Sequence, residues 1–99
     1  MIEEKMRING KKVDGENGNI DVINPFNSAK VGTVPRASKK QIDQTMEIAK
    51  NFQPKLTRYE RQQILSKTAE LLISRRDEIS DLITAESGLS KKDSLYEVG

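Results

Sequence analysis

Residues 38–52 read SKKQIDQTMEIAKNF, and they mark the point where the character of the chain changes. Ser38 and Gln41 fit a capping box, in which the hydroxyl accepts the amide of the third helical residue and the glutamine side chain reaches back. Four apolar residues follow at the spacing of one helical face: Ile42, Met46, Ala49 and Phe52. A helix is therefore expected to begin after Ser38 and to be stopped by Pro54.

Helical periodicity continues downstream. Thr57 and Glu60 form a second capping box. An apolar stripe at helical spacing follows it, made of Ile64, Leu65, Ala69, Leu72 and Ile73. After an expected break near Arg75-Arg76, a third and shorter stripe is made of Ile79, Leu82 and Ile83. Gly88 terminates that helix, because glycine enters the left-handed region at little cost.

A fourth helix is expected at the end of the chain. Ser90 caps it, and its apolar residues are Leu95, Tyr96 and Val98. The helix is cut off at Gly99 without a polar tail. A truncated reading frame is expected to explain this ending better than a natural carboxyl terminus does.

Upstream of residue 36 the chain has short runs of β-forming residues, most of the glycines and two of the three prolines. Asn9-Gly10 joins residues 6–8 to residues 11–13, and this dipeptide favours the type I′ turn of a tight hairpin. Further strands are expected at residues 20–23 and 30–34, with a turn between them.

These patterns predict an α+β fold class, in which short antiparallel strands lead into three or four helices. Residues 1–36 would hold the strands and turns, and residues 38–99 the helices. The apolar stripes of the helices are expected to form the core. At 99 residues and 4% aromatic content that core is thin, which fits either a marginal domain or a piece that relies on neighbours.

Composition excludes several classes of protein. The net charge is only +2, and the basic pairs are scattered instead of clustered on one face, so nucleic-acid binding is not expected. There is no Cys and no His, which removes disulfides, a thiol nucleophile and the commonest general base. No apolar run reaches the length of a membrane span and residues 1–7 lack a signal peptide's apolar stretch, so a cytoplasmic protein is expected.

Several polar residues of the strand region could carry function. The Asn9-Gly10 turn lies between strands, whereas a phosphate-binding loop follows a strand and opens a helix, so turn geometry is the favoured role. Lys11 and Lys12 could steer an anionic substrate, but solvent exposure on a hairpin is favoured. Asn24-Pro25 is expected to be structural. Thr33 and Val34 could line a cation or cofactor surface, although an ordinary strand is favoured.

Among the carboxylates of the helical region, five are weighed as functional candidates: Glu60, Glu70, Asp77, Asp81 and Glu86. Glu60 is interpreted as a cap. Glu86 lies near a helix carboxyl end, where the helix dipole disfavours an acid, so a specific partner is expected for it. Arg61 is expected to pair with an acid such as Asp43 or Glu86. Because no second ionisable group stands at a defined spacing, a structural role is favoured over acid–base catalysis.

An ordered set of segments resembles the amino-terminal part of the aldehyde dehydrogenase superfamily. The segments are INGKKV (8–13), VINP (22–25), VGTVP (31–35), IAKNF (48–52), RQQIL (61–65) and ESG (86–88). The resemblance covers residues 7–99; each segment is weak alone, and the order makes the set specific.

The resemblance implies that residues 1–99 form the amino-terminal part of a cofactor-binding domain, with the catalytic domain absent. It implies a parent enzyme that oxidises an aldehyde to a carboxylate with NAD or NADP, as a homodimer or homotetramer. In such enzymes a Cys thiolate attacks the aldehyde, hydride passes to the nicotinamide, and a Glu-activated water hydrolyses the thioester. All these groups, the cofactor-binding ones included, lie beyond residue 99. No catalytic, cofactor-binding or metal residue is therefore expected here, and the isolated chain is expected to be inactive and to bind no cofactor.

Two finer likenesses point to one branch of the family. LTRYER (56–61) and SKKDSLYEVG (90–99) resemble the branch that oxidises phosphonoacetaldehyde to phosphonoacetate, a step of phosphonate breakdown. In that branch Arg58 could face the phosphonate. The alternative function is a stand-alone helical protein-interaction module without catalysis, because three amphipathic helices can form a groove.

Overall fold

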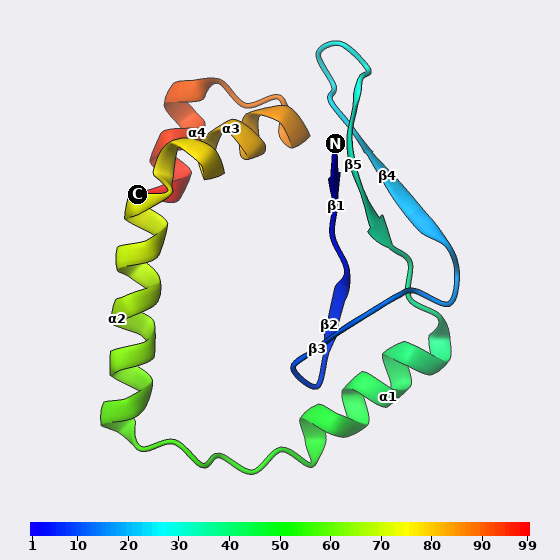
Figure 1. Ribbon diagram of the computed structural model, residues 1–99, viewed down its shortest axis with the longest axis vertical. Helices are drawn as coiled ribbons and strands as arrows, with labels where there is room; N and C mark the ends of the chain where they lie inside the picture. Colours follow the sequence, from blue (N-terminus) through cyan, green and yellow to red (C-terminus); the bar gives the residue numbers. More distant parts are fainter. The chain divides into compact units, whose positions relative to one another are not determined.

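The computed structural model describes all 99 residues, and they divide into two compact units. Unit 1 comprises Met1–Ile23 and Ser28–Gln53, and unit 2 comprises Asn24–Asn27 and Pro54–Gly99. Figure 1 follows the chain from its blue amino-terminal strands to its red last helix. Unit 1 holds every strand and the first helix, and unit 2 holds the other three helices. The expected order, short strands followed by four helices, is confirmed.

The larger sheet of unit 1 has three strands in the order β1-β5-β4. Strands β4 (Asn19–Ile23) and β5 (Lys30–Pro35) form the expected antiparallel pair. Strand β1 (Ile2–Glu3) pairs with β5 in parallel, so the expectation of an antiparallel arrangement alone was wrong. The pairing occurs because β5 has a second edge with unpaired backbone groups, which any extended segment can bond whatever its sequence pattern.

The second sheet is the tight hairpin of β2 (Met6–Ile8) and β3 (Lys11–Val13). Both turn residues have positive φ, 54° for Asn9 and 74° for Gly10. These are the values that a type I′ turn requires, so the expected hairpin is confirmed.

Helix α1 (Lys39–Lys50) begins with the expected capping box of Ser38 and Gln41. It ends at Asn51, whose amide bonds to the Glu47 carbonyl at 3.1 Å. The helix therefore stops before Pro54, because the residues that precede a proline are pushed out of the helical region. Phe52 lies past the helix end, and its expected place on the apolar face of α1 was wrong.

The side chain of Gln41 connects α1 to the loop that precedes β4. It is 9% exposed, and its Oε1 accepts the amides of Glu16 at 3.0 Å and Ser38 at 3.1 Å. Its Nε2 donates to the Asp14 carbonyl at 2.9 Å. Ser38 adds a bond from its hydroxyl to the Glu16 carboxylate at 2.6 Å. A residue expected only to cap a helix therefore also holds a loop more than twenty residues upstream.

Unit 2 contains α2 (Arg58–Ser74), α3 (Arg76–Ser87) and α4 (Lys91–Val98). Thr57 and Glu60 form the second capping box, and the chain breaks at Arg75 between α2 and α3, both as expected. Gly88 ends α3 in the left-handed conformation with φ of 79°. The Ser90 side chain accepts the Asp93 amide at the start of α4.

Helix α3 packs against α4 (Figure 1), and small polar side chains lie at this contact. Ser80 and Ser94 are fully buried, and Ser94 shares a hydrogen bond of 2.7 Å with Thr84. The Lys91 ammonium donates to the Ser80 hydroxyl and to the Asp81 carboxylate, the latter at 2.6 Å. Because serines occupy little volume, they let the two helix backbones approach closely, and the hydrogen bonds satisfy the buried hydroxyls.

No large apolar side chain of the chain is buried. Leu65 is 69% exposed and Met46 is 66% exposed, although both belong to the predicted stripes. The expectation that the stripes form a core was therefore wrong for these 99 residues. An amphipathic pattern tells which side of a helix avoids water, but it does not require that the covering surface belong to the same chain.

Replacing Gln41 with Ala is expected to release the loop that precedes β4. Each lost hydrogen bond contributes about 1 kcal/mol, so amide exchange at Glu16 should accelerate by about fivefold or more. Hydrogen exchange followed by NMR measures this rate. Gln44→Ala on the same helix is the control and should leave Glu16 unchanged. Equal rates in both variants would contradict the role of Gln41.

Protonation of Glu60 is expected to loosen the start of α2. The hydrogen bond from the Thr57 amide to the carboxylate, 3.0 Å long, lowers the pKa of Glu60 below its ordinary value of 4.5. The stabilisation is thus complete above pH 4.5 and is lost as the pH falls through the lowered pKa. In an NMR titration the Thr57 amide signal should move with a midpoint below 4.5. Glu60→Gln keeps the cap and should abolish this transition; a midpoint at or above 4.5 would exclude the bond.

The isolated 99-residue chain is expected to unfold over a broad temperature range and to bind an apolar dye. Its helices carry exposed apolar faces, and helices of this length need tertiary packing for most of their stability. Circular dichroism during a thermal ramp, with dye fluorescence, measures both properties. A sharp transition without dye binding would instead support the stand-alone module.

Candidate functional site

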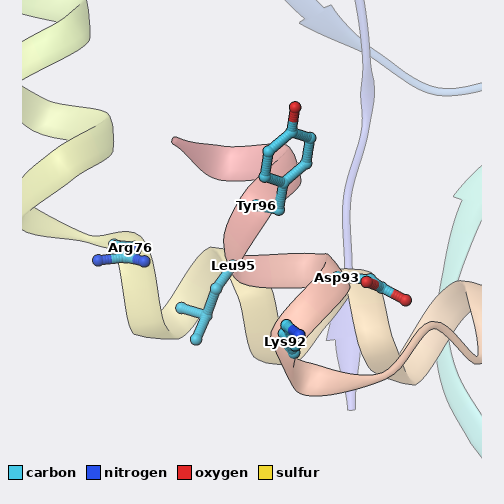
Figure 2. Close-up of a pocket in the computed structure, with 5 residues that line it drawn as sticks. All are labelled: Arg76, Lys92, Asp93, Leu95 and Tyr96. Atoms are coloured by element: carbon cyan, nitrogen blue, oxygen red, sulfur yellow. The ribbon is translucent and has the colours of Figure 1, made fainter.

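A hollow of unit 2 lies beside α4 and holds about 550 Å³. It is lined by Arg76, Lys92, Asp93, Leu95 and Tyr96, drawn in Figure 2. In that view Tyr96 and Asp93 point away from each other and away from Arg76. Tyr96 is 83% exposed. Polar groups that do not converge cannot orient a small substrate, so this hollow lacks the geometry of an active site.

The hollows of unit 1 lie between the β2–β3 hairpin and α1. One holds about 370 Å³ and is lined by Met6, Arg7, Ile8, Ala37, Gln41, Ile42, Thr45 and Met46. The other holds about 260 Å³ and is lined by Ile8, Asn9, Lys11, Val13, Gln41, Gln44 and Ile48. Both linings combine apolar side chains with neutral amides and one cationic side chain, Arg7 in the first and Lys11 in the second, and neither contains a carboxylate, a thiol or an imidazole. They are surfaces for packing and lack the groups that acid–base or nucleophilic catalysis needs.

The residues present do not fit a dinucleotide phosphate. A phosphate cradle needs glycines in a turn that follows a strand and opens a helix. The Asn9-Gly10 turn joins two strands, and Gly88 ends a helix. The one strand-to-helix connection of the chain, residues 36–38 between β5 and α1, has no glycine. No group of three or more His, Cys, Asp or Glu side chains has the arrangement of a metal site.

The candidates of the strand region have local roles. Lys11 and Lys12 are exposed, and Lys12 lies 3.5 Å from Glu4. The pKa of Glu4 is lowered, first by the hydrogen bond from the Lys5 amide and then by the charge of Lys12. Asn24 accepts the Phe26 amide through Oδ1 at 2.9 Å, so its predicted structural role is confirmed.

Thr33 and Val34 occupy β5 as ordinary strand residues. The Thr33 carbonyl accepts the Glu4 amide at 3.1 Å, and Val34 pairs with Ile20 across the antiparallel ladder. Their backbone groups are therefore used in the sheet. A role at a cation or cofactor surface stays a prediction.

The carboxylates of the helical region are mostly held by neighbours on the same or the adjacent helix. Glu60 caps α2 as expected. Glu70 pairs with Lys67 at 3.6 Å, and Asp81 pairs with Lys91 at 2.6 Å. Asp77 contributes through its backbone carbonyl, which accepts hydrogen bonds from the Ser80 hydroxyl and the Lys91 ammonium. None of these acids faces a second ionisable group with the geometry of a catalytic pair.

The expected ion pair of Arg61 was wrong. Its guanidinium donates to the Leu56 carbonyl at 2.8 Å, and Asp43 pairs with Lys39 at 3.0 Å. Both observed contacts are local, and local contacts of flexible charged side chains need less ordering than distant ones do. The Glu86 side chain is exposed and makes no hydrogen bond or ion pair within the chain, so the partner expected for it is not among these residues.

Two structurally important groups were missed by the sequence reasoning. One is the Arg75–Glu78 pair at the α2–α3 junction, 2.6 Å long, which lowers the pKa of Glu78 and raises that of Arg75. The other is Lys91, which bonds α4 to α3. The Arg75–Glu78 pair could have been predicted, because oppositely charged residues three positions apart lie next to each other on a helix. No local pattern predicted the bonds of Lys91, because its partners are ten or more residues away in the sequence.

None of the helices is both long and apolar enough to cross a membrane.

Comparison with known proteins gives consistent matches to one family. The model of the family described as "Aldehyde dehydrogenase family" matches residues 12–99. The NADP-dependent succinate-semialdehyde dehydrogenase of Escherichia coli is 33% identical over 92 residues, which are 89% of this chain and 19% of that protein. A glutarate-semialdehyde dehydrogenase of Pseudomonas putida is similar to the same extent. The chain thus spans about a fifth of the length of these relatives.

Solved structures agree in backbone as well as in sequence. An NAD-dependent aldehyde dehydrogenase from Sinorhizobium meliloti matches 99% of this chain with a TM-score of 0.89 and 28% identity, over 21% of its own length. Aldehyde dehydrogenase 21 from Physcomitrella patens matches 97% with the same TM-score and 32% identity, over 21% of its length. With the family model covering residues 12–99, these matches show that the chain belongs to the aldehyde dehydrogenase family.

Proposed function

We propose that residues 1–99 form the amino-terminal part of the cofactor-binding domain of an NAD(P)-dependent aldehyde dehydrogenase. The observation that carries this proposal is the family match over residues 12–99, supported by the backbone agreement with complete enzymes. The whole protein oxidises an aldehyde to a carboxylate, with NAD or NADP accepting the hydride. It acts in the cytoplasm as a homodimer or homotetramer.

The role of these residues within that enzyme is structural. The chain has no Cys to act as nucleophile and no glycine-containing turn that opens a helix. Its polar side chains are used in caps and in helix-to-helix bonds, as the pairs around Gln41 and Lys91 show. The nucleophile, the acid–base group and the groups that bind the cofactor lie outside these 99 residues.

The proposed substrate is a short aldehyde with an anionic group at its other end. Residues 56–61 and 90–99 resemble the branch that converts phosphonoacetaldehyde to phosphonoacetate, which would make phosphonoacetaldehyde the substrate. The relatives named above are dehydrogenases of succinate semialdehyde and glutarate semialdehyde. Each of those compounds joins an aldehyde to a distant carboxylate, as phosphonoacetaldehyde joins one to a phosphonate. An anionic substrate is the chemistry these likenesses share.

A stand-alone interaction module is the less favoured alternative. The exposed apolar faces of the helices fit it, but the match to a catalytic family extends over residues 12–99. A family match of that extent indicates an enzyme scaffold.

Two measurements test the proposed function. The isolated chain should produce no reduced cofactor above a blank with any aldehyde, because it lacks the nucleophile. The genomic sequence beyond codon 99 should encode a Gly-rich turn, a Glu and a Cys in frame. The protein encoded by the whole frame should then reduce NAD or NADP with phosphonoacetaldehyde. We expect its kcat/KM to exceed that for uncharged acetaldehyde by roughly tenfold, the effect of about 1.4 kcal/mol of charge recognition.

The contrary results are equally definite. A genuine stop after codon 99 without a downstream frame would remove the enzyme assignment for this locus. A preference for succinate semialdehyde over phosphonoacetaldehyde would retain the enzyme and overturn the branch. Cofactor reduction by the isolated chain would overturn the structural role given to these residues.

A further inference from the structure

The chain contains two Asn-Gly dipeptides, and both are exposed on unit 1. Asn9-Gly10 forms the turn of the β2–β3 hairpin, and Asn17-Gly18 directly precedes β4. An asparagine loses its side-chain amide most readily when glycine follows it, because glycine has no Cβ to shield the backbone nitrogen that attacks the side chain. Since both dipeptides are exposed, their hydrogen bonds decide which of them can react.

The reacting groups of Asn9-Gly10 are free. The Asn9 side chain makes no hydrogen bond within the chain, and the Gly10 amide has no acceptor. A Cβ placed on Gly10 would meet no other atom within 4 Å, so the space around its backbone is open. No contact within the chain therefore has to break before the Gly10 nitrogen approaches the Asn9 side chain.

The turn can reach the reactive geometry while the hairpin stays closed. The first central residue of a type I′ turn has ψ of about +30°, and a flip of the central peptide gives a type II′ turn with ψ of about −120°. Because Cα is tetrahedral, ψ of about −120° eclipses the Gly10 nitrogen with the Asn9 Cβ, beside the carbonyl carbon of that side chain. Both turns join strands through two residues, so the pairing of Ile8 with Lys11 persists during the flip.

Asn17-Gly18, in contrast, is held by residues that follow β5. The Asn17 amide donates to the Arg36 carbonyl at 3.1 Å, and the Arg36 amide donates to the Gly18 carbonyl at 2.8 Å. The Asn17 side chain donates through Nδ2 to the Ala37 carbonyl at 3.5 Å. Rotation of that side chain toward the Gly18 nitrogen would break its bond to Ala37, so fewer reactive conformations are accessible than at Asn9.

We propose that Asn9 is a site of spontaneous deamidation in the folded protein, and that the contacts with Arg36 and Ala37 protect Asn17. The Gly10 nitrogen gives up its proton and bonds to Asn9 Cγ, while the bond from Cγ to Nδ2 breaks and ammonia leaves. Water then opens the cyclic imide at either of its carbonyl carbons. One opening gives aspartate, and the other gives isoaspartate, in which the main chain passes through the former side chain. The reaction consumes only water, so it goes beyond the proposed function.

The two products have different consequences for the hairpin. Aspartate before glycine favours the same type I′ turn, so this product keeps the hairpin and adds a negative charge. Isoaspartate adds a methylene carbon to the main chain, so the two-residue loop no longer fits the register of Ile8 with Lys11. Asn9 also lines the hollow of about 260 Å³ together with Gln44 and Ile48 of α1. Isoaspartate at position 9 therefore loosens the hairpin where it faces α1.

The test follows both sites in the protein that the whole frame encodes, incubated in mildly alkaline buffer either folded or in concentrated urea. Trypsin cleaves after Arg7 and Lys12 and so separates the two sites, and mass spectrometry detects the exchange of NH₂ for OH in each peptide. Electron-transfer fragmentation distinguishes isoaspartate from aspartate. In the folded protein we expect Asn9 to react at least roughly fivefold faster than Asn17, the effect of about one hydrogen bond. In urea the two rates should become similar, because the contacts of Asn17 are lost.

Variants make the test specific. Asn9→Asp keeps the turn and has no amide to lose, so the mass change should disappear from its peptide. Gln41→Ala releases the loop that contains Asn17 and should accelerate deamidation there while the Asn9 rate stays the same; Gln44→Ala on the same helix should leave Asn17 slow. Equal rates at Asn9 and Asn17 in the folded protein, or reaction of Asn9 in urea only, would overturn the proposal. An unchanged Asn17 rate in Gln41→Ala would overturn the protection, and the comparison with urea stands even where that variant does not fold.

Discussion

Hydrogen bonds from buried polar side chains connect elements of this chain that are distant in sequence. No large apolar side chain is buried beside them. Gln41 is the main example. Its amide group bonds the loop before β4 and the residue before α1 at the same time. The first turn of α1 and the path of the chain into β4 therefore depend on one side chain. Hydrogen bonds of this kind contribute only about 1 kcal/mol each, so they set geometry more than they supply stability.

Unit 2 uses the same principle with different residues. Ser80 and Ser94 allow α3 and α4 to approach, and Lys91 bonds the two helices together. The apolar residues that would normally provide most of the stability stay exposed, as Leu65 and Ile73 of α2 do. The shape of unit 2 is thus specified by caps and by polar contacts between neighbouring helices, in a chain that spans about a fifth of the length of its relatives.

Much of the fold could be predicted from local patterns. The capping boxes at Ser38 and Thr57, the Asn9-Gly10 turn and the Gly88 stop each involve residues within three or four positions, and each was confirmed. Such signals depend on backbone chemistry that acts within one turn. The expectation that no catalytic residue lies here rested on composition, because the chain has neither a Cys thiol nor a His imidazole. It did not depend on geometry.

The sequence by itself determined where the helices begin and where most strands lie, and the ordered motifs indicated the family. Only the tertiary structure decided which distant groups meet: β1 beside β5, Gln41 beside Asp14 and Glu16, and Lys91 beside Asp81. It also showed that the apolar stripes of α1 and α2 lie exposed, whereas that of α3 is half-buried. The physical reason is the distance along the chain over which each kind of interaction acts. Turn and cap preferences arise between adjacent residues, whereas burial and long-range pairing depend on which surfaces come together, and a hydrophobic pattern does not identify its partner.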